Sequence, residues 1–570
     1  MMLEYAARSE FAVGSNLRGG AAAANWCFLL PALEFRRILC VGVPRTAAIT
    51  MLSRLGGEVV VVAPTRRAAD TVAVEARQNG LANVVAVGED GSDGMAAAAA
   101  ASVDLVWVSD RRWRGRIDRR LLAAVDRVLG PDGLVYLEAS GRRAVEDSCR
   151  VLRARLGPLA RWTLSPHRGE PHLAVPERHA AVAGFLSHHG FVASSPGRLT
   201  RRLPAAVTRL ARPVRRLGGA RIGFLAGRRP VEESLPEYVR VVAAAAGVEV
   251  GDRPWALWAP GRYESKKVIF LVFDRSARRL ELIVKLPRAR ALNHRLDNEW
   301  QALGRLRDLG IGDPGTLPRP AFFGSHGGLA VLGQTAVDGV GFERRTNATA
   351  DCADARRARE WLVAFGIRTI QRPAADGSRA GAVLDSLHRR FSDTYTLGHH
   401  HRERLAAHVL ALSQAEARLP PVFQHGDPGV WNVVVTASGQ VGFLDWEAAE
   451  PQGMPLWDVF YLMRSFGVVV ARAGGRRPTV DTFAAQYLQD TPLSRLLAGA
   501  IARFCRATNL DPGLVGPLLS TCWMHRALKE STRLRADRLD DGHYVNLLRR
   551  TLVDHDAPGL RRLCSLETAR

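Results

Sequence analysis

The feature that most constrains the fold of this chain is an acidic stretch that begins at Phe423 and reads FQHGDPGVWNVVVTASGQVGFLDWEAAEP. It contains two short apolar runs, VVV and QVGFL, separated by the turn sequence TASG, and this pattern predicts a β-hairpin. The hairpin would bring Asp445, at its far end, beside Asp427 and Asn432, which precede its first strand. Carboxylates that lie close together repel one another unless a divalent cation binds them both. The stretch therefore predicts a metal site.

The spacing within HGDPGVWN indicates a specific chemistry. Asp427 and Asn432 have the Asp-x-x-x-x-Asn spacing that kinases use for a catalytic base and a metal ligand. Phosphoryl transfer from ATP needs metal ions that neutralise the phosphates, and one group that orients the incoming hydroxyl and accepts its proton. Carboxylate and amide side chains at a fixed spacing meet both needs.

The whole stretch resembles the aminoglycoside phosphotransferase and choline kinase-like family, whose members are small-molecule kinases with a protein kinase-like fold. The resemblance covers the chain from about residue 232 to the C-terminus. It implies that Asp427 is the catalytic base and that Asn432 and Asp445 bind Mg²⁺. It also implies that His425 braces the loop, and that ATP is the phosphate donor.

Two more acids follow the hairpin. Glu447 stands in DWE, where protein kinases have Asp-Phe-Gly, and it is a candidate for a further metal contact. Asp458, in PLWDVFYL, is expected to support the loop from the next helix. Only the short segment EAAEPQGMPLW lies between Asp445 and that helix, which leaves no room for an activation segment. The sequence therefore favours a small-molecule kinase over a protein kinase.

The residues that would hold the nucleotide form a separate set. A kinase needs a cation on a central strand of its small lobe and a carboxylate on the following helix. Lys285 lies in the apolar run LELIVKLP, and Glu299 follows on the next predicted helix. The run VLGQTAV resembles the hinge strand, whose backbone from Gln334 to Ala336 would face adenine. Gly261, in APGRYESKKVIF, would cover the nucleotide.

The first part of the chain has a different pattern. The apolar runs RRILCVG, EVVVVAP, NVVAVG, VDLVWVSD and GLVYLEA alternate with amphipathic helices, which predicts a parallel, doubly wound α/β domain from about 26 to 156. The pattern, and the helix that ends VLGPDG before a strand, resemble class I S-adenosylmethionine-dependent methyltransferases. The chain is thus expected to join an α/β Rossmann-like domain to an α+β, two-lobed kinase-like domain.

The cofactor-binding residues of such methyltransferases are largely missing. A cofactor site of this kind needs closely spaced glycines after the first strand and an acid after the second. After the first strand the chain has only Gly42, and Pro44 and Arg45 follow it. After the second strand, no carboxylate directly follows Val62. Asp110 is a single acid at a strand end. We therefore expect a degenerate domain that does not bind S-adenosylmethionine, with a bifunctional methyltransferase-kinase and a non-catalytic two-domain scaffold as the alternatives.

The expected domain order follows from these patterns. It comprises a Rossmann-like domain over 1–156, an extension or linker over 157–231, and a kinase-like domain over 232–570. Within the last, the small lobe would span about 250–340 and the helical lobe about 341–570.

Composition and charge limit which partners and which cellular compartment we expect for this chain. The chain has 570 residues and a formal charge of +23, but its arginines are spread along the sequence and not interleaved with aromatics, so we expect no specific nucleic-acid partner. Its seven cysteines form no CxxC pair, and no apolar run is long enough to span a membrane. We expect a cytoplasmic enzyme. The segment 497–570 is rich in Arg, which favours a sugar, an amino alcohol or a glycan or lipid precursor as acceptor over a polyamine.

Overall fold

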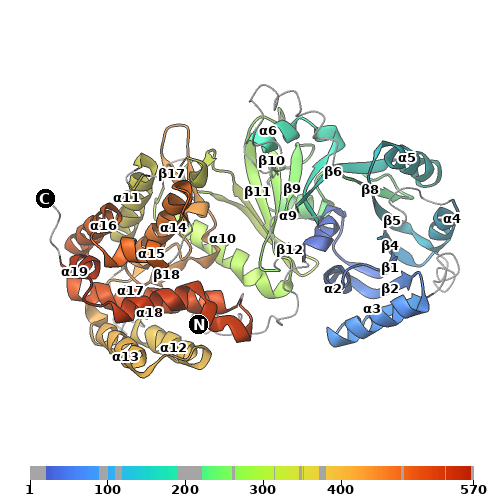
Figure 1. The fold of residues 1–570 in the computed structure, drawn as a ribbon. Helices are drawn as coiled ribbons and strands as arrows, with labels where there is room; N and C mark the ends of the chain where they lie inside the picture. Colours follow the sequence, from blue (N-terminus) through green and yellow to red (C-terminus); the bar gives the residue numbers. More distant parts are fainter. Residues whose placement is uncertain are drawn as a thin grey trace. The chain divides into compact units, whose positions relative to one another are not determined.

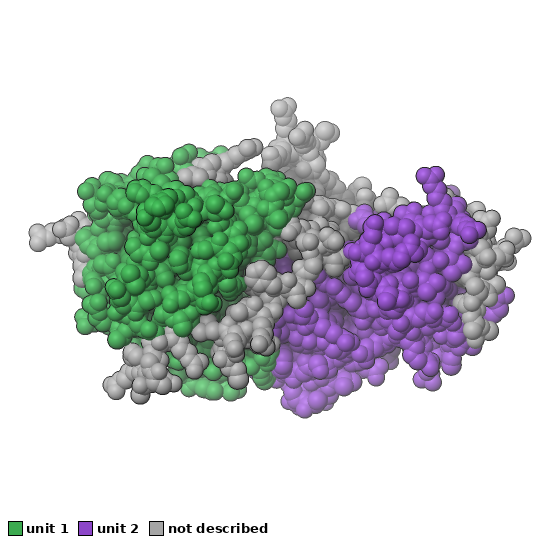
Figure 2. Space-filling view, turned by 90° about the horizontal axis from the view of Figure 1, so that it is seen from below, with its two compact units in different colours: residues 1–13, 297–319, 337–570 green, residues 14–296, 320–336 purple. Residues whose placement is uncertain are grey.

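The computed structural model forms two compact units. The sheet unit comprises Gly14–Leu296 and Pro320–Ala336, and the helical unit comprises Asp297–Arg319 and Val337–Arg570 (Figure 2). Within these bounds the structure describes residues 21–88, 101–109, 119–167, 170–188, 221–259, 264–312, 315–345, 349–350, 352–371, 380–476, 480–532 and 534–565.

The sheet unit begins with a parallel, doubly wound sheet, as the sequence predicts. Its strands have the order β3-β2-β1-β4-β5, and every neighbouring pair is parallel. The elements, after the helix η1 (Ala21–Leu29), are β1 (Phe35–Val41), α2 (Thr46–Leu55), β2 (Gly56–Ala63), α3 (Arg66–Gln78), β3 (Val84–Gly88), β4 (Val103–Val108), α4 (Arg119–Val128), β5 (Leu129–Ala139) and α5 (Arg142–Leu156). The order reverses between β1 and β4, where ligands bind in such sheets.

Both faces of this parallel sheet are covered, which explains the continuous apolar runs. Ile38 and Cys40 of β1 pack on one face with α2 and η1. Leu39 and Val41 of the same strand pack on the other face with α4 and α5 (Figure 1). Because successive side chains of a strand point to opposite faces, every position from Ile38 to Val41 is buried.

The same sheet continues through the segment predicted as an extension or linker. This segment contributes β6 (Leu159–His167), β7 (Glu170–Pro176) and β8 (Arg221–Gly227), and the helices η3 (Glu177–His179) and α6 (Val182–His188) lie between β7 and β8 in the chain. Helix α9 (Glu237–Ala245) follows the segment. These strands pair antiparallel in the order β5-β8-β6-β7-β9. The domain boundaries at 156 and 231 stay predictions.

The sheet ends in the antiparallel strands expected of the small lobe. Their order is β9-β10-β11-β13-β12, which completes a sheet of 13 strands within the described residues. The elements are β9 (Trp255–Trp258), β10 (Val268–Phe273), β11 (Leu280–Leu286), η5 (Arg290–Leu292), β12 (Pro320–His326) and β13 (Leu329–Thr335). The helix α10 (Asn293–Asp308) leads from this unit into the other.

The helical unit is built mainly of helices, again as the sequence predicts. They are α11 (Ala353–Arg368), α12 (Ala380–Thr394), α13 (His399–Gln414), α14 (Trp457–Ala473), α15 (Val480–Phe483), α16 (Pro492–Thr508), α17 (Val515–Ser531), α18 (His543–Val553) and α19 (Pro558–Cys564), with short turns η6 (Phe342–Arg344), η7 (Glu416–Arg418), η8 (Val430–Asn432), η9 (Trp446–Ala448), η10 (Ala484–Leu488), η11 (Pro512–Leu514) and η12 (Ala536–Asp541). Its strands are β14 (Val340–Gly341), β15 (Val422–Gln424), β16 (Val433–Val435), β17 (Val441–Phe443) and β18 (Glu450–Gly453).

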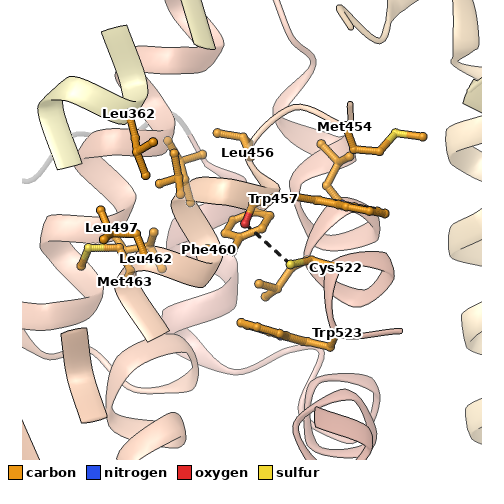
Figure 3. Packing of buried hydrophobic residues seen from close by; sticks show 14 of the residues in the cluster. Leu362, Met454, Leu456, Trp457, Phe460, Leu462, Met463, Leu497, Cys522 and Trp523 are labelled. Carbon is orange, nitrogen blue, oxygen red and sulfur yellow. Dashed lines mark hydrogen bonds between the residues drawn. The ribbon is translucent and has the colours of Figure 1, made fainter. Parts of the chain in front are cut away.

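The core of the helical unit is centred on α14 and α17. Trp457 and Phe460 of α14 are buried with Cys522 and Trp523 of α17 (Figure 3). The thiol of Cys522 donates to the carbonyl oxygen of Trp457 at 3.7 Å. This packing fixes the two helices whose polar side chains reach the acidic stretch.

All seven cysteines are free thiols. Among the described residues, no helix is both long enough and apolar enough to cross a membrane.

Candidate functional site

The predicted catalytic loop runs from His425 to Asn432, between β15 and β16. Gly426 has φ +75°, and a Cβ at this position would collide with the carbonyl oxygen of Ala448. Only glycine combines this backbone conformation with so close an approach. The loop is therefore pressed against the segment that follows Asp445.

Two side chains of helix α14 hold the loop by hydrogen bonds. The carboxylate of Asp458 accepts hydrogen bonds from the backbone N–H groups of His425 (2.6 Å) and Gly426 (3.1 Å). The hydroxyl of Ser465 accepts from the N–H of Val430 at 3.1 Å. Burial raises the pKa of Asp458 to about 6, against the two hydrogen bonds, which lower it. Asp458 thus supports the loop from the next helix, as the sequence indicates.

His425 links the loop to the predicted hairpin. Its Nε2 donates to the carbonyl oxygen of Leu444 at 2.9 Å, and its Nδ1 accepts from the N–H of Asp427 at 3.2 Å. The imidazole is fully buried, with its ring centre 4.4 Å from that of Trp446, and burial lowers its pKa to about 4. His425 is therefore a neutral imidazole that positions backbone on both sides of it.

The hairpin forms as predicted and delivers Asp445 to the loop. Strands β16 and β17 pair antiparallel, with Val433 opposite Phe443. Beyond them, the N–H of Leu444 donates to the carbonyl oxygen of Asn432 at 2.8 Å. Asp445 follows with φ +69° and ψ +63°, a left-handed conformation that is uncommon for a residue with a side chain and that concentrates at functional sites.

Asn432 lies against Asp427 in a way that suits a metal ligand. Its Nδ2 donates to the carbonyl oxygen of Asp427 at 2.9 Å and approaches Oδ2 of that carboxylate at 3.4 Å. The amide oxygen therefore points away from Asp427. Amide and carboxylate oxygens are the ligands that Mg²⁺ prefers, so Asn432 and Asp445 fit this ion chemically. Among the described residues, no group of three or more His, Cys, Asp and Glu is placed to hold a metal.

Asp427 has a partner that the sequence did not reveal. Both terminal nitrogens of Arg526, in α17, donate to Oδ1 of Asp427 at 3.2 Å. The Cζ atom of Arg526 lies 3.1 Å from the centre of the Tyr461 ring, and Nζ of Lys529 donates to the carbonyl oxygen of Gly426 at 3.4 Å. Burial raises the pKa of Asp427, but the charges of Arg526 and Lys529 outweigh it and lower the pKa below its usual value.

The sequence carries a weak signal for this pair of cations. Arg526 and Lys529 are three residues apart and share one face of α17. Arginine is so frequent in the segment 497–570 that this spacing does not stand out. Nothing in the local pattern of α14 distinguishes Tyr461 from the buried residues around it.

Helix α10 contacts the segment after Asp445. Glu299 is fully buried, and its Oε1 accepts from the N–H of Trp446 at 3.3 Å. The side-chain amide of Asn298 donates to the carbonyl oxygens of Glu447 and Ala449. The helix is thereby joined to the residues that carry the predicted metal ligand.

The remaining predicted nucleotide residues lie in the sheet unit. Lys285 is buried in β11, opposite Leu332 of β13. Gln334 is buried in the same strand, and the N–H of Ala336 donates to the carbonyl oxygen of Glu281 at 2.8 Å, so that donor is engaged within the sheet. Gly261 lies outside the described residues. Since Lys285 and Glu299 belong to different units, their pairing stays a prediction.

The residues after β1 and β2 bear on the expectation that this domain does not bind S-adenosylmethionine, which stays a prediction. After β1, Gly42 has φ +105°, but no second glycine follows before α2. After β2, Thr65 caps helix α3 by accepting from the N–H of Ala68 at 3.2 Å, and the exposed Arg66 and Arg67 stand where a ribose-binding acid would be needed. Asp110 lies outside the described residues.

The geometry described for 425–458 lies within a segment that matches a known family. Residues 265–497 match the model of the phosphotransferase enzyme family (APH). Over this segment, which is less than half of its length, the chain is similar to that family. The match includes His425, Asp427, Asn432 and Asp445, whereas Arg526 lies beyond its C-terminal limit. No curated protein matches the chain.

Three solved structures that resemble this chain do so with low sequence identities and with TM-scores below 0.5. An aminoglycoside phosphotransferase from Streptomyces rimosus, solved with ADP and streptomycin, is 16% identical over 52% of this chain and 90% of its own, with a TM-score of 0.30. Geranyl diphosphate C-methyltransferase from Streptomyces coelicolor A3(2) is 14% identical over 36% of this chain and 76% of its own, with a TM-score of 0.24. WbdD, solved with a kinase inhibitor, is 12% identical over 94% of this chain and 87% of its own, with a TM-score of 0.22.

Proposed function

We propose that this chain transfers the γ-phosphate of ATP, in a Mg²⁺-dependent reaction, to a hydroxyl group of a small molecule. The observation that carries this proposal is the hydrogen bonding of Leu444. Its N–H donates to Asn432, and its C=O accepts from His425. This double link holds Asp445 against the loop that carries Asp427 and Asn432, which is the set of groups that phosphoryl transfer requires.

Each residue of the loop has a role in the proposed reaction. Asp427 orients the acceptor hydroxyl and accepts its proton, while His425 positions the backbone of Asp427. Asn432 and Asp445 would hold Mg²⁺, which when bound neutralises the phosphate charge. In the sheet unit, Lys285 is the candidate for the phosphates of ATP.

Further residues complete the proposed nucleotide site. Glu299 would partner Lys285, Gln334 and Ala336 would lie at the adenine, and Gly261 would cover the nucleotide. The assignments of Glu299, Gln334 and Ala336 rest on the resemblance to small-molecule kinases and on the family match of 265–497. That of Gly261 rests on the resemblance alone.

The charges near Asp427 bear on the acceptor. Arg526 and Lys529 both lie on the side of the loop formed by α17. Two cations next to the proposed base would repel a ligand that carries several ammonium groups, since each buried ammonium needs a counter-charge. A sugar, an amino alcohol, or a glycan or lipid precursor is therefore favoured over a polyamine.

The proposal is tested by incubating the chain with ATP, Mg²⁺ and a panel of hydroxylated acceptors, and by following ³¹P NMR signals. The expected result is a new phosphomonoester signal that depends on ATP, on Mg²⁺ and on one class of acceptor. Thermal unfolding with ATP and Mg²⁺ is measured in parallel. No phosphate transfer, together with no thermal shift, would favour a non-catalytic scaffold.

A further inference from the structure

An exposed tryptophan lies within the predicted catalytic loop. Trp431 is 50% exposed and directly precedes Asn432. Tryptophan is among the residues that gain most from burial, so a half-exposed indole at this place calls for an explanation. An exposed apolar side chain that is isolated on a surface needs no functional explanation, but this one lies in the loop that carries Asp427 and Asn432.

The indole of Trp431 is held in place on two sides. A Cβ at Gly429 would collide with its ring, so the ring lies directly over the backbone of that glycine. The ring system also contacts Tyr461 nearly at right angles, with ring centres 5.9 Å apart and planes at 82°. Such an edge-to-face contact is a favoured aromatic geometry. The remaining exposed surface of the indole is therefore presented in a fixed orientation.

Contacts through Tyr461 and Arg526 connect the indole to the proposed base, Asp427. Tyr461 packs its ring against the guanidinium of Arg526, and Arg526 donates both of its hydrogen bonds to Asp427. A rigid aromatic surface and a carboxylate thus share one packed set of side chains. Rigid aromatic side chains provide contact area at a small cost in conformational entropy.

Two classes of ligand use an aromatic surface of this kind. One is a quaternary ammonium group, which is attracted to the ring face. Here the face of Tyr461 is already taken by Arg526, and Lys529 adds a second positive charge on the same side of the loop. The other class is an uncharged ring with an apolar face and polar edges, such as a pyranose, and these cations do not repel it.

We propose that Trp431 is an acceptor-binding residue, and that its indole stacks on the apolar face of a pyranose ring whose hydroxyl faces Asp427. This inference rests on the proposed function, because it takes the acceptor to be bound at Asp427. It narrows the acceptor from hydroxylated small molecules in general to sugars or sugar-containing precursors. Trp431 then determines specificity and has no part in the proton transfer.

The test is saturation-transfer NMR on the full chain with the methyl glycosides of glucose, galactose and mannose, and with choline and sorbitol as non-ring probes. The variants are Trp431→Ala, Trp431→Phe and, as a matched control, Leu410→Ala, which truncates another exposed side chain of the helical unit (56% exposed). We expect at least one glycoside to bind the wild type, Trp431→Phe and Leu410→Ala. Trp431→Ala should bind it at least tenfold more weakly.

Other outcomes would overturn the inference. These are glycosides that do not bind the wild type, glycosides that bind Trp431→Ala as tightly as the wild type, and choline binding that depends on Trp431. Thermal unfolding confirms that each variant is folded. Because NMR detects binding without turnover, glycoside binding that depends on Trp431 and no phosphate transfer would refute the proposed function alone. Phosphate transfer with no effect of Trp431→Ala on binding would refute this inference alone.

Discussion

Arg526 donates two hydrogen bonds, each of 3.2 Å, to the same oxygen of Asp427. The side chain of Arg526 is only 8% exposed, and it also lies over the ring of Tyr461. A buried arginine that is paired in this way fixes the carboxylate, because a carboxylate that turns away leaves the charge of Arg526 buried and unpaired. The base proposed from the loop sequence is thus oriented by a helix about a hundred residues further along the chain.

Replacing Arg526 should lower turnover more than substrate binding. In Arg526→Met, Asp427 loses the partner that orients it, and we expect kcat to fall by about 100-fold, a typical cost of a misplaced catalytic group. The KM for ATP should change little. Arg526→Lys keeps the charge but not the planar fork, so its kcat should lie between those of the wild type and Arg526→Met. Steady-state kinetics on folded variants would contradict this if both kept the wild-type kcat.

Lys285→Ala should weaken the handling of the nucleotide. Lys285 is buried in β11 and is the proposed partner of the ATP phosphates. Without it, we expect the KM for ATP to rise by about tenfold, which corresponds to about 1.4 kcal/mol. Lys266→Ala, which removes an exposed lysine from the same unit, is the matched control and should leave the KM unchanged. Equal KM values for the two variants would argue against the assignment.

Asp445→Asn should increase the requirement for Mg²⁺. The substitution keeps the size of the side chain and removes the negative charge that would bind the ion. We expect the Mg²⁺ concentration for half-maximal activity to rise at least about tenfold, measured by titration at saturating ATP. Glu447→Gln is the comparison. If Glu447→Gln raises the requirement and Asp445→Asn does not, the metal ligand has been assigned to the wrong acid.

The stability of the proposed catalytic loop should depend on pH through Asp458. Burial raises the pKa of this carboxyl group to about 6, so the folded state favours its protonated form. The stabilisation that follows is present below the usual pKa near 4 and is lost as the pH rises through 6. Relative to Asp458→Asn, the wild type should lose roughly 2 kcal/mol of unfolding free energy between pH 4.5 and 7, because one pKa unit corresponds to about 1.4 kcal/mol and the side chain is only partly buried.

Urea unfolding of both proteins at several pH values measures this difference. A difference in unfolding free energy that does not change between pH 4.5 and 7 would contradict the raised pKa of Asp458. A difference that changes in the opposite direction would mean that the hydrogen bonds from His425 and Gly426 outweigh burial.

The regular parts of the fold follow from the sequence because their signals are local. The run RRILCVG predicts β1, and the run LELIVKLP predicts β11, since short, mainly apolar runs indicate strands that are buried on at least one face. The hairpin before Asp445 follows from VVV, TASG and QVGFL in the same way. Periodicity also predicts which strands are parallel, because helices alternate with them.

The arrangements that the sequence does not reveal depend on contacts between distant residues. The pairing of β7 with β9, which continues the first sheet into the small-lobe strands, joins segments about 80 residues apart. The contact of Arg526 with Asp427 is of the same kind. The sequence around Arg526 does not show which residue it contacts, because the packing of α14 against α17 determines that partner.

Turnover of Asp427→Ala tests the central claim most directly. The variant is compared with the wild type at saturating ATP, Mg²⁺ and acceptor, and ATP binding is followed by thermal shift. If Asp427 orients and deprotonates the acceptor hydroxyl, kcat should fall by about 10²- to 10⁴-fold while the shift with ATP is retained. A folded Asp427→Ala variant with a kcat close to that of the wild type would contradict the account.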